Sequence, residues 1–315
     1  MDSASLELIK RNTVEIVEEK ELIELFDRKK HPVTYCGYET SGPVHLGHLV
    51  TITKLMDLMK AGCRVKVLFA DWHTYLNQKG EWDFIHDQAK VWQDTFKKAG
   101  LDDAEFVLGS SFQRNLNYFD DLLKMSLDTT LQRALRSMQE IARDIEHAKV
   151  SQIIYPFMQV EDIKALGVEI AQAGIEQRKI HMLARELLPL LNYRAPVCVH
   201  SPLIPSLQKG GKMSSSVPES HIALADSPEA IQKKVAKAFC PEALTEDNPI
   251  FAIAQLLILP RMGKLEVRRP AKHGGDITIA SHDELKTLYL SKGLHPQDLK
   301  VAVAQALVED LSVFR

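Results

Sequence analysis

The stretch VTYCGYETSGPVHLGHLVTITKLMDLMKAGCRVKVLFA, residues 33–70, decides the fold. Residues 33–37 are predicted to form a short buried strand, because they are a largely apolar run that directly follows a proline. Apolar side chains then recur at helical spacing over residues 45–60, where an Ala-Gly pair ends the helix. Residues 64–70 form a second strand candidate. Strand, helix and strand at this spacing indicate a parallel sheet of the doubly wound type.

The rest of the chain extends this pattern. Residues 6–26 predict one or two surface helices, and the segment beyond Ser227 has helical apolar spacing almost to its end. We therefore place a domain boundary near residue 226 and expect an α/β catalytic domain followed by a smaller all-helical domain. Further helices are expected at residues 84–99, 117–128, 130–143, 152–166 (with Pro156 at or near its start) and 177–187, and further strands at residues 105–108, 169–172 and 196–200.

Composition narrows the class of protein. The chain has 315 residues, is 45% hydrophobic and carries a formal net charge of -3, so any nucleic-acid surface must be a local patch. Its four cysteines are widely scattered, which predicts neither a zinc site nor a disulfide framework. We expect no transmembrane helix and no signal peptide, and free thiols fit a reducing, cytoplasmic location.

Two histidines open the first predicted helix in the sequence His45-Leu46-Gly47-His48. They are three residues apart and so share one helical face. A helix N-terminus presents free N–H groups and a partial positive charge, which suit phosphate. Gly47 leaves room for a ligand near the backbone, and ligands bind at the carboxyl edge of doubly wound sheets. The motif predicts a phosphate site; two ordinary helical histidines are the alternative.

A second motif, Lys212-Met213-Ser214-Ser215-Ser216, follows a Gly-Gly pair inside a polar stretch that reads as a loop, residues 201–219. A lysine on a loop can meet a phosphate as a point charge, and serine hydroxyls can add hydrogen bonds. The spacing of a Walker P-loop is absent. A flexible polar linker is the alternative reading of this composition.

Together the two motifs resemble the signatures of class I aminoacyl-tRNA synthetases, usually written HIGH and KMSKS, in the order and separation that this family uses. Residues 35–39, 70–73, 155–162 and 174–181 look like those of tyrosyl-tRNA synthetases. The compact chain and the sequence HPQDLK at residues 295–300 are similar to the archaeal and eukaryotic branch. The resemblance covers nearly the whole chain. It implies a Rossmann-like catalytic domain, residues 1–226, with N-terminal helices, an acceptor-stem-binding insertion and the KMSSS loop, then an α-helical anticodon-recognition domain, residues 227–315.

The resemblance also implies a tyrosine pocket. Asp162 would accept the hydrogen bond of the substrate phenol, and Tyr35 would share it. The spacing agrees, because Tyr155, Gln159 and Asp162 fall on one face of one helix. A buried carboxylate without a partner is costly, so a pocket that contains one rejects phenylalanine. Core and rim positions of an amphipathic helix are the alternative. The side chains implied to hold the ammonium group and the ring are Glu39, Tyr155, Gln159 and Gln177.

The nucleotide and tRNA contacts come from the resemblance as well. His273 stands where a phenylalanine is expected, and an imidazole can still stack on a base. Thr40 replaces a more familiar proline. Arg133, Arg136 and Arg143 share one broad helical face, whose default environment is solvent. The implied catalytic residues are His45, His48, Lys212, Ser214 and Ser215; the ATP contacts are His45, Gly47, His48, Lys212 and Met213; Arg136 and Arg178 lie near the first acceptor-stem base pair; and Cys240, Pro241, His273, His295 and Asp298 lie near the first anticodon base.

The implied reaction needs little acid–base chemistry. The tyrosine carboxylate attacks the α-phosphate of ATP, pyrophosphate leaves, and the acyl group passes to the terminal adenosine of tRNA(Tyr). Because the nucleophile is already ionised, catalysis consists mainly of positioning and charge stabilisation. Magnesium is expected to arrive with ATP, with no tightly bound protein metal. The family habit is a homodimer.

Four other classes of protein remain open. Tryptophanyl-tRNA synthetases share the fold and both signatures, although Tyr35 with Asp162 favours a phenol over an indole. Small nucleotidyltransferases share the first motif, but they are usually shorter and lack the second. A non-catalytic RNA-binding relative is disfavoured by the intact His45, His48 and Lys212. An engineered enzyme with a different amino-acid preference is disfavoured by the presence of both Tyr35 and Asp162.

Overall fold

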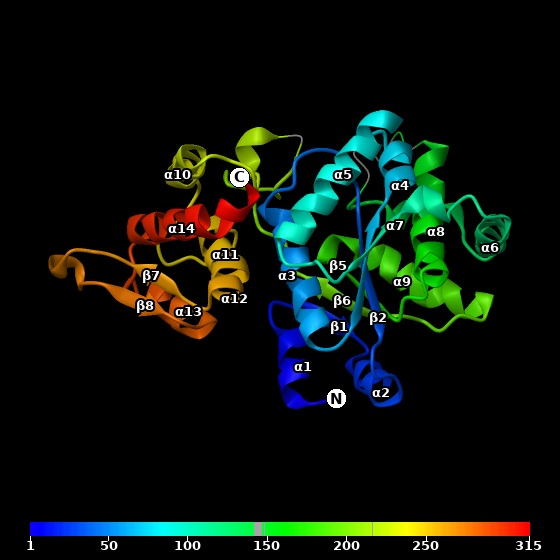
Figure 1. Ribbon diagram of the computed structural model, residues 1–315, viewed down its shortest axis with the longest axis horizontal. Helices are drawn as coiled ribbons and strands as arrows, with labels where there is room; N and C mark the ends of the chain where they lie inside the picture. Colours follow the sequence, from blue (N-terminus) through cyan, green and yellow to red (C-terminus); the bar gives the residue numbers. More distant parts are fainter. Residues whose placement is uncertain (142–146, 148, 216) are drawn as a thin grey trace. The chain divides into compact units, whose positions relative to one another are not determined.

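The computed structural model describes residues 1–141, 147, 149–215 and 217–315 (Figure 1). The chain forms two compact units, Met1–Ser41 with Lys54–Pro202 and Gly42–Thr53 with Leu203–Arg315. Helix α3, Leu46–Lys60, begins in the second unit and ends in the first. The domain boundary near residue 226 stays a prediction. Arg143 and Ser216 lie outside the described residues.

The first unit contains the predicted doubly wound sheet. Its strand order is β1-β6-β5-β2-β3-β4, and only the β1–β6 pair is antiparallel. The chain runs outward from β2 through β3 to β4 and then returns to β5 on the other side of β2. The carboxyl ends of β2 and β5 therefore frame the switch point where ligands bind in such sheets. The strands are β1 Glu15–Val17, β2 Val33–Tyr38, β3 Arg64–Phe69, β4 Glu105–Leu108, β5 Ile170–Gly174 and β6 Val197–Ser201.

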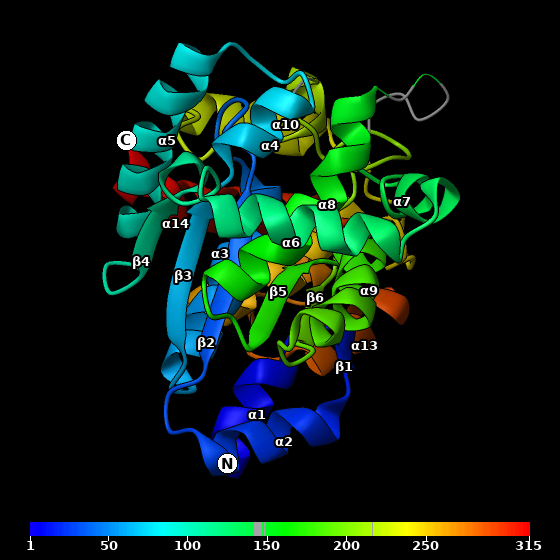
Figure 2. The same cartoon turned by 90° about the vertical axis from the view of Figure 1, so that its right-hand side faces the viewer.

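Helices cover both faces of this sheet (Figures 1 and 2). Helices α6, α8 and α9 lie over one face, and α5 lies over the other. Helix α8 begins at Val150, so Pro156 lies inside the helix rather than at its start. The buried residues between α8, α9 and the sheet form one apolar cluster that includes Val160 and Leu183. The helices of this unit are α1 Ser3–Lys10, α2 Glu19–Arg28, α4 Asp71–Leu76, α5 Trp82–Lys98, α6 Leu116–Leu127, α7 Leu131–Ser137, α8 Val150–Ala165 and α9 Arg178–Leu187.

The N-terminal region was expected to contain only helices, but the structure also has a strand there. Strand β1 separates α1 from α2 and has only three half-buried residues. It pairs with β6 in the register Glu15 to His200. A segment this short carries no readable alternation of apolar and polar residues. Its extended conformation is set by hydrogen bonding to a strand that lies far away in the sequence.

The second unit is mainly helical, but the expectation of an all-helical C-terminal region is wrong, because this region also contains a small antiparallel sheet. Strands β7, Leu265–Val267, and β8, Ile277–Ile279, pair with each other. Helix α10 packs against α14. Among the residues that the structure describes, no helix is long and apolar enough to cross a membrane. The helices of this unit, apart from the start of α3, are α10 Pro228–Lys237, α11 Pro249–Ile253, α12 Leu259–Met262, α13 His282–Leu290 and α14 Pro296–Asp310.

Candidate active site

The carboxylate of Asp162 is the central polar group of the first unit. It lies on α8 and is fully buried. Its Oδ1 accepts a hydrogen bond of 2.8 Å from the side-chain amide of Gln113 and lies 2.8 Å from the hydroxyl of Tyr118. Its Oδ2 has no hydrogen-bond partner among the residues that the structure describes, and Nε2 of His73 lies 3.6 Å away. One oxygen is therefore fixed by the protein, while the other can accept a hydrogen bond from a ligand.

Burial controls the protonation of this region. It raises the pKa of Asp162 to about 7, against the hydrogen bonds from Gln113 and Tyr118. Burial also raises the pKa of Tyr35 well above its ordinary value, and the charge of Asp162 adds to that shift. Burial lowers the pKa of His73 to about 4, so this imidazole is neutral at pH 7. At neutral pH the carboxyl of Asp162 is therefore near its midpoint, while the Tyr35 hydroxyl and the His73 ring are uncharged.

Three further predicted residues lie around this carboxylate. Tyr155 is buried on α8, and its ring meets that of His73 edge-on with centroids 4.6 Å apart. The side-chain amide of Gln159 donates to Oε1 of Gln177 at 3.3 Å. A hydrogen bond with Gln159 also acts on the hydroxyl of Tyr35, where it lowers the pKa. The side chains predicted to bind the phenol and those predicted to bind the ammonium group are thus neighbours across β2, α8 and the residues before α9.

Glu39 has protein partners of its own. Its Oε1 accepts a hydrogen bond of 2.9 Å from Asn77, and its Oε2 is ion-paired with Lys79. Only 16% of the Glu39 side chain is exposed. An incoming ammonium group would therefore share this carboxylate with Lys79. The prediction that Glu39 holds the ammonium group stays a prediction.

The first signature lies in the second unit, at the start of α3. The backbone N–H of Gly47 donates to Nδ1 of His45 at 3.1 Å, and the backbone N–H of His45 donates to Nδ1 of His48 at 3.2 Å. The two rings stack with centroids 3.8 Å apart. A Cβ atom on Gly47 would lie 2.8 Å from Cε1 of His45, so the folded-back ring requires glycine there. Burial lowers the pKa of His45 far below its ordinary value, and the ring is therefore neutral.

The second signature lies in the same unit, close to the first. A Cβ atom on Gly47 would be 3.8 Å from Cβ of Met213, and one on Gly42 would be 3.2 Å from Cβ of Ser215. The backbone N–H of Ser214 donates to Oγ of Ser220 at 3.1 Å. Lys212 is exposed, whereas Met213 is buried. The structure therefore brings together two motifs that are more than 160 residues apart in the sequence.

The two arginines predicted at the acceptor stem have different surroundings. Arg136 lies on α7 and is exposed. Arg178 begins α9, and its Nε donates to Oε1 of Glu15 at 2.6 Å. About half of the Arg178 side chain is exposed, with a fraction of 48%. Arg133, which was predicted to share a helical face with Arg136 and Arg143, is paired with Glu186 through two hydrogen bonds.

The predicted anticodon residues occur in two places of the second unit. Sγ of Cys240 lies 3.2 Å from the Tyr289 hydroxyl, which donates to the carbonyl of Pro241 at 2.7 Å. His295 caps α14, where its Nδ1 accepts from the N–H of Gln297, and Asp298 lies in the first turn of that helix. His273 ends a short 3₁₀ segment, Ala271–His273, between β7 and β8.

Sequence reasoning missed three side chains that surround Asp162. Gln113 and Tyr118 hold Asp162 from positions 49 and 44 residues away in the chain, so no local spacing indicates them. His73 was part of the matched stretch Ala70-Asp71-Trp72-His73 but received no role. Its position near Asp162 Oδ2 makes it part of the pocket wall.

Comparison with known proteins gives consistent results. The family model described as tRNA synthetases class I (W and Y) matches residues 27–312. A tyrosine–tRNA ligase of Archaeoglobus fulgidus is 51% identical over 304 residues, covering 96% of this chain and 94% of that protein. One of Methanocaldococcus jannaschii is 48% identical over 309 residues, covering 98% of each.

Solved structures give the same result. The crystal structure of the tyrosyl-tRNA synthetase from Archaeoglobus fulgidus complexed with L-tyrosine superposes with a TM-score of 0.96 at 50% identity, covering 99% of this chain and 98% of that one. A tryptophanyl-tRNA synthetase from Aeropyrum pernix has a TM-score of 0.77 at 20% identity, covering 95% of this chain and 81% of that one, a likeness of fold alone.

Proposed function

Because the chain belongs to the class I tRNA synthetases for tryptophan and tyrosine, we propose that it joins L-tyrosine to tRNA(Tyr) with ATP. In the first step the tyrosine carboxylate attacks the α-phosphate, which forms tyrosyl-adenylate and releases pyrophosphate. In the second step the acyl group passes to a ribose hydroxyl of the 3′-terminal adenosine. Relatives named tyrosine–tRNA ligase, at about half identity over nearly the full length, support tyrosine rather than tryptophan.

One observation carries the choice of substrate. Asp162 presents a buried oxygen, Oδ2, for which the described part of the chain offers no hydrogen-bond partner, while its other oxygen is held by Gln113 and Tyr118. A phenolic O–H supplies the donor that this oxygen lacks, and a phenylalanine ring does not. An indole N–H would need an acceptor at a different distance from the backbone. Tyr35, whose hydroxyl is close enough for the Asp162 charge to raise its pKa, completes the phenol end of the pocket.

The two signatures supply the groups proposed to meet the phosphates. His45 and His48 open α3, and their stacked rings and the helix N-terminus meet the α-phosphate with ring N–H donors and a partial positive charge. Lys212, exposed on its loop with Ser214 and Ser215 behind it, meets the departing pyrophosphate. Gly47 and Met213 line the nucleotide side. No residue is needed to take a proton from the nucleophile, because a tyrosine carboxylate is ionised at neutral pH.

Magnesium enters as part of the substrate, the MgATP complex, in which it neutralises phosphate charge. Within the described part of the chain, no three His, Cys, Asp or Glu side chains gather as a metal site. The ion would therefore be held chiefly by the phosphates. The protein groups proposed to contact ATP are those of the two signatures.

The tRNA contacts divide between two regions. Arg136 and Arg178 would read the first base pair of the acceptor stem, and both are exposed or half-exposed near the start or end of a helix. The region after residue 226 would read the anticodon. Its contacts would come from Cys240, Pro241, His273, His295 and Asp298, with Asp298 accepting from a guanine edge.

A homodimer in the cytoplasm is the proposed working form. Helix α6 carries an exposed apolar stripe at helical spacing, with Leu116 81%, Phe119 53%, Leu123 66% and Leu127 87% exposed. Exposed apolar stripes of this kind mark protein–protein contacts. A second copy of the chain is the occupant that the family habit implies. The stripe gives that interface a hydrophobic centre that the monomer leaves in water.

Amino-acid-dependent ATP–pyrophosphate exchange with all twenty amino acids tests the proposal. Exchange with tyrosine alone is the expected result. Exchange with tryptophan would keep the reaction class and refute the assignment of Asp162 and Tyr35 to a phenol. No exchange from folded protein would refute activation itself and leave an RNA-binding relative as the better account.

A further inference from the structure

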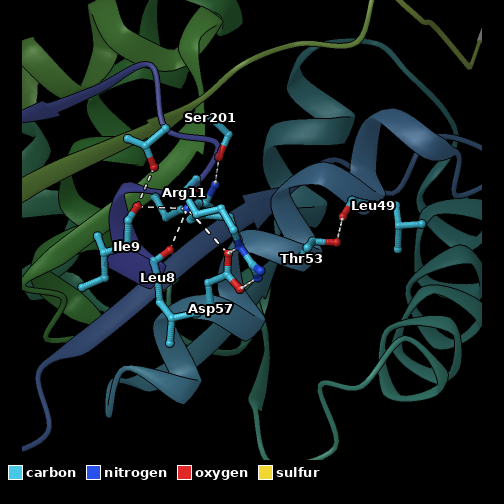
Figure 3. Close-up of polar contacts among 10 residues, drawn as sticks. Leu8, Ile9, Arg11, Leu49, Thr53, Asp57 and Ser201 are labelled. Carbon is cyan, nitrogen blue, oxygen red and sulfur yellow. Dashed lines mark hydrogen bonds and ion pairs between the residues drawn. The ribbon is translucent and has the colours of Figure 1, made fainter. Parts of the chain in front are cut away.

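The N-terminal segment, residues 1–17, is fastened to the first unit by a buried ammonium group. Lys54, on α3, is only 2% exposed. Its Nζ donates to the carbonyl oxygens of Leu8 at 3.3 Å and Ile9 at 2.9 Å and also to that of Arg11. These carbonyls end helix α1, where a positive charge is favourable (Figure 3).

A second contact fastens the same segment. Both carboxylate oxygens of Asp57, one turn beyond Lys54, bind the Arg11 guanidinium, in a paired geometry that fixes orientation (Figure 3). Asp57 also lies 3.7 Å from the Lys54 ammonium. Asp57 is nearly fully buried, with 3% of its side chain exposed. The chain that leaves α1 therefore has a fixed starting point for β1, four residues further on.

Strand β1 then delivers a carboxylate to the start of α9. Glu15 pairs with His200 of β6 in the antiparallel register. Its Oε1 accepts from Nε of Arg178 at 2.6 Å and lies 2.9 Å from Nδ1 of His200. Burial opposes ionisation of Glu15, but the hydrogen bonds from Arg178 and His200 outweigh it and leave its pKa below the usual value. The carboxylate is thus held on two sides.

The histidine side of this contact extends into the core. Nε2 of His200 lies 2.9 Å from Nδ1 of His181, and both residues are fully buried. Burial lowers the pKa of each, so both rings are neutral at pH 7. A carboxylate requires a donor, so Nδ1 of His200 carries hydrogen and its Nε2 accepts from His181. The chain of hydrogen bonds sets the direction of the Glu15 carboxylate from behind.

We propose that Glu15 is a positioning residue for tRNA, which holds Arg178 with its terminal guanidinium nitrogens directed to the acceptor stem. This rests on the proposed function, in which Arg178 reads the first base pair. Arg178 donates to Glu15 through Nε, which leaves its terminal nitrogens outside that bond, and 48% of its side chain is exposed. The two terminal nitrogens are the pair that binds a phosphate or a guanine edge.

The contact with Glu15 orients the Arg178 side chain and adds little to the stability of the fold. Half-exposed ion pairs contribute little to the free energy of unfolding. A flexible arginine, however, loses side-chain entropy when it binds, and holding it in advance removes part of that loss. Because Glu15 is fixed by β1, by His200 and by the Lys54 anchor, its carboxylate can act as a rigid support.

The matched control comes from the same two elements of the structure. Glu21 on α2 pairs with Arg185 on α9 through two hydrogen bonds, at 2.9 and 3.1 Å. This is also an N-terminal glutamate bound to an α9 arginine, two turns beyond Arg178. Glu21→Gln therefore removes a comparable ion pair without touching the proposed RNA contact.

The experiment compares the full chain carrying Glu15→Gln, Glu21→Gln, Arg178→Ala and Glu15→Gln with Arg178→Ala. We expect Glu15→Gln to raise the KM for tRNA(Tyr) in aminoacylation about tenfold, equivalent to one charge-assisted hydrogen bond. Tyrosine-dependent ATP–pyrophosphate exchange should stay unchanged in Glu15→Gln, and Glu21→Gln should change neither assay. The double variant should be no worse than Arg178→Ala, since the support acts only through that arginine.

Three results would overturn the inference. A KM for tRNA that is unchanged or lower in Glu15→Gln excludes a supporting role, and a lower value would indicate that Glu15 restrains Arg178. Losses that add fully in the double variant place Glu15 outside the Arg178 contact. Equal losses in exchange and aminoacylation, checked against thermal unfolding, mean a general structural role. Failure of the proposed function itself appears separately, as absent tyrosine-dependent exchange in the unaltered chain.

Discussion

Replacement of Asp162 by asparagine should impair recognition of the substrate phenol while it preserves the hydrogen bonds that hold this side chain in the fold. The amide oxygen can still accept from Gln113 and Tyr118, which bind Oδ1 at 2.8 Å each. The amide nitrogen, however, replaces the unpartnered Oδ2 with a donor. A phenolic O–H then meets an N–H where it met a carboxylate oxygen. Alanine at this position would also take away the acceptor of the buried Gln113 amide, whereas the Tyr118 hydroxyl could still donate to the carbonyl of Met158, so asparagine is the cleaner change.

The expected loss follows from the hydrogen-bond inventory. A hydrogen bond to a charged group contributes about 1.5–3 kcal/mol, and an unsatisfied buried partner costs about 1–3 kcal/mol. Together they predict a loss of about 2.5–6 kcal/mol, or roughly 10²- to 10⁴-fold in kcat/KM for tyrosine. The KM for ATP should change little, because the signatures that meet the nucleotide are not altered. Phenylalanine, which has no hydroxyl to lose, should be discriminated against far less by Asp162→Asn.

The assay is ATP–pyrophosphate exchange with tyrosine, phenylalanine and ATP each varied in turn. A pH series adds a second signature, because burial raises the pKa of Asp162 to about 7. In the unaltered enzyme kcat/KM for tyrosine should fall as the pH drops below 7 and the free carboxyl gains a proton. Asp162→Asn should lack that fall. Equal losses for tyrosine and ATP, or an unchanged ratio of tyrosine to phenylalanine, would refute the reasoning.

Other perturbations address the remaining parts of the structure. His48→Ala should lower the rate of tyrosyl-adenylate formation in single-turnover exchange, and an unchanged rate would make the first signature structural. Gly47→Ala places a methyl group 2.8 Å from Cε1 of His45 and should lower kcat for activation about tenfold or more, with little change in melting temperature. Lys54 has a folded pKa of about 8 against an ordinary 10.5, so the native state releases its proton first. The free energy of unfolding should therefore rise between those two pH values, and Lys54→Met should remove that rise in denaturant titrations at stepped pH. Leu123→Glu should shift the sedimentation profile from dimer toward monomer, whereas an unchanged profile would place the interface elsewhere than on the α6 stripe.

The central part of the fold could be predicted closely because its signals are local. The expected segments at residues 33–37, 45–60 and 64–70 appear as β2, α3 and β3 within about one residue at each end. Buried strands give continuous apolar runs, and the intervening helix has an apolar face of regular spacing. Strands β1, β7 and β8 have three residues each, too few for any periodicity to show. Their conformation depends on partners distant in the sequence.

The site divides in the same way. The resemblance indicates Tyr35 and Asp162, and the structure buries both, close enough for the charge of Asp162 to raise the pKa of Tyr35. The groups that determine how Asp162 behaves, Gln113 and Tyr118, come from a segment without a motif, and only tertiary packing brings them there. Glu39 shows the opposite case, since its position follows the motif but its ion pair with Lys79 could not be read from spacing.

The pairing of β1 with β6 also has a consequence for how the chain folds as it is made. Glu15 and His200 are separated by 185 residues, so β1, which is synthesised first, cannot pair until β6, the last strand of the sheet, has been synthesised. Contacts of such long range form slowly, and exposed strand edges in the meantime invite association with other chains. Lys54, only 45 residues from Ile9, can capture helix α1 much earlier in synthesis. The buried ammonium group would thus hold the nascent N-terminus beside its eventual place until β6 leaves the ribosome.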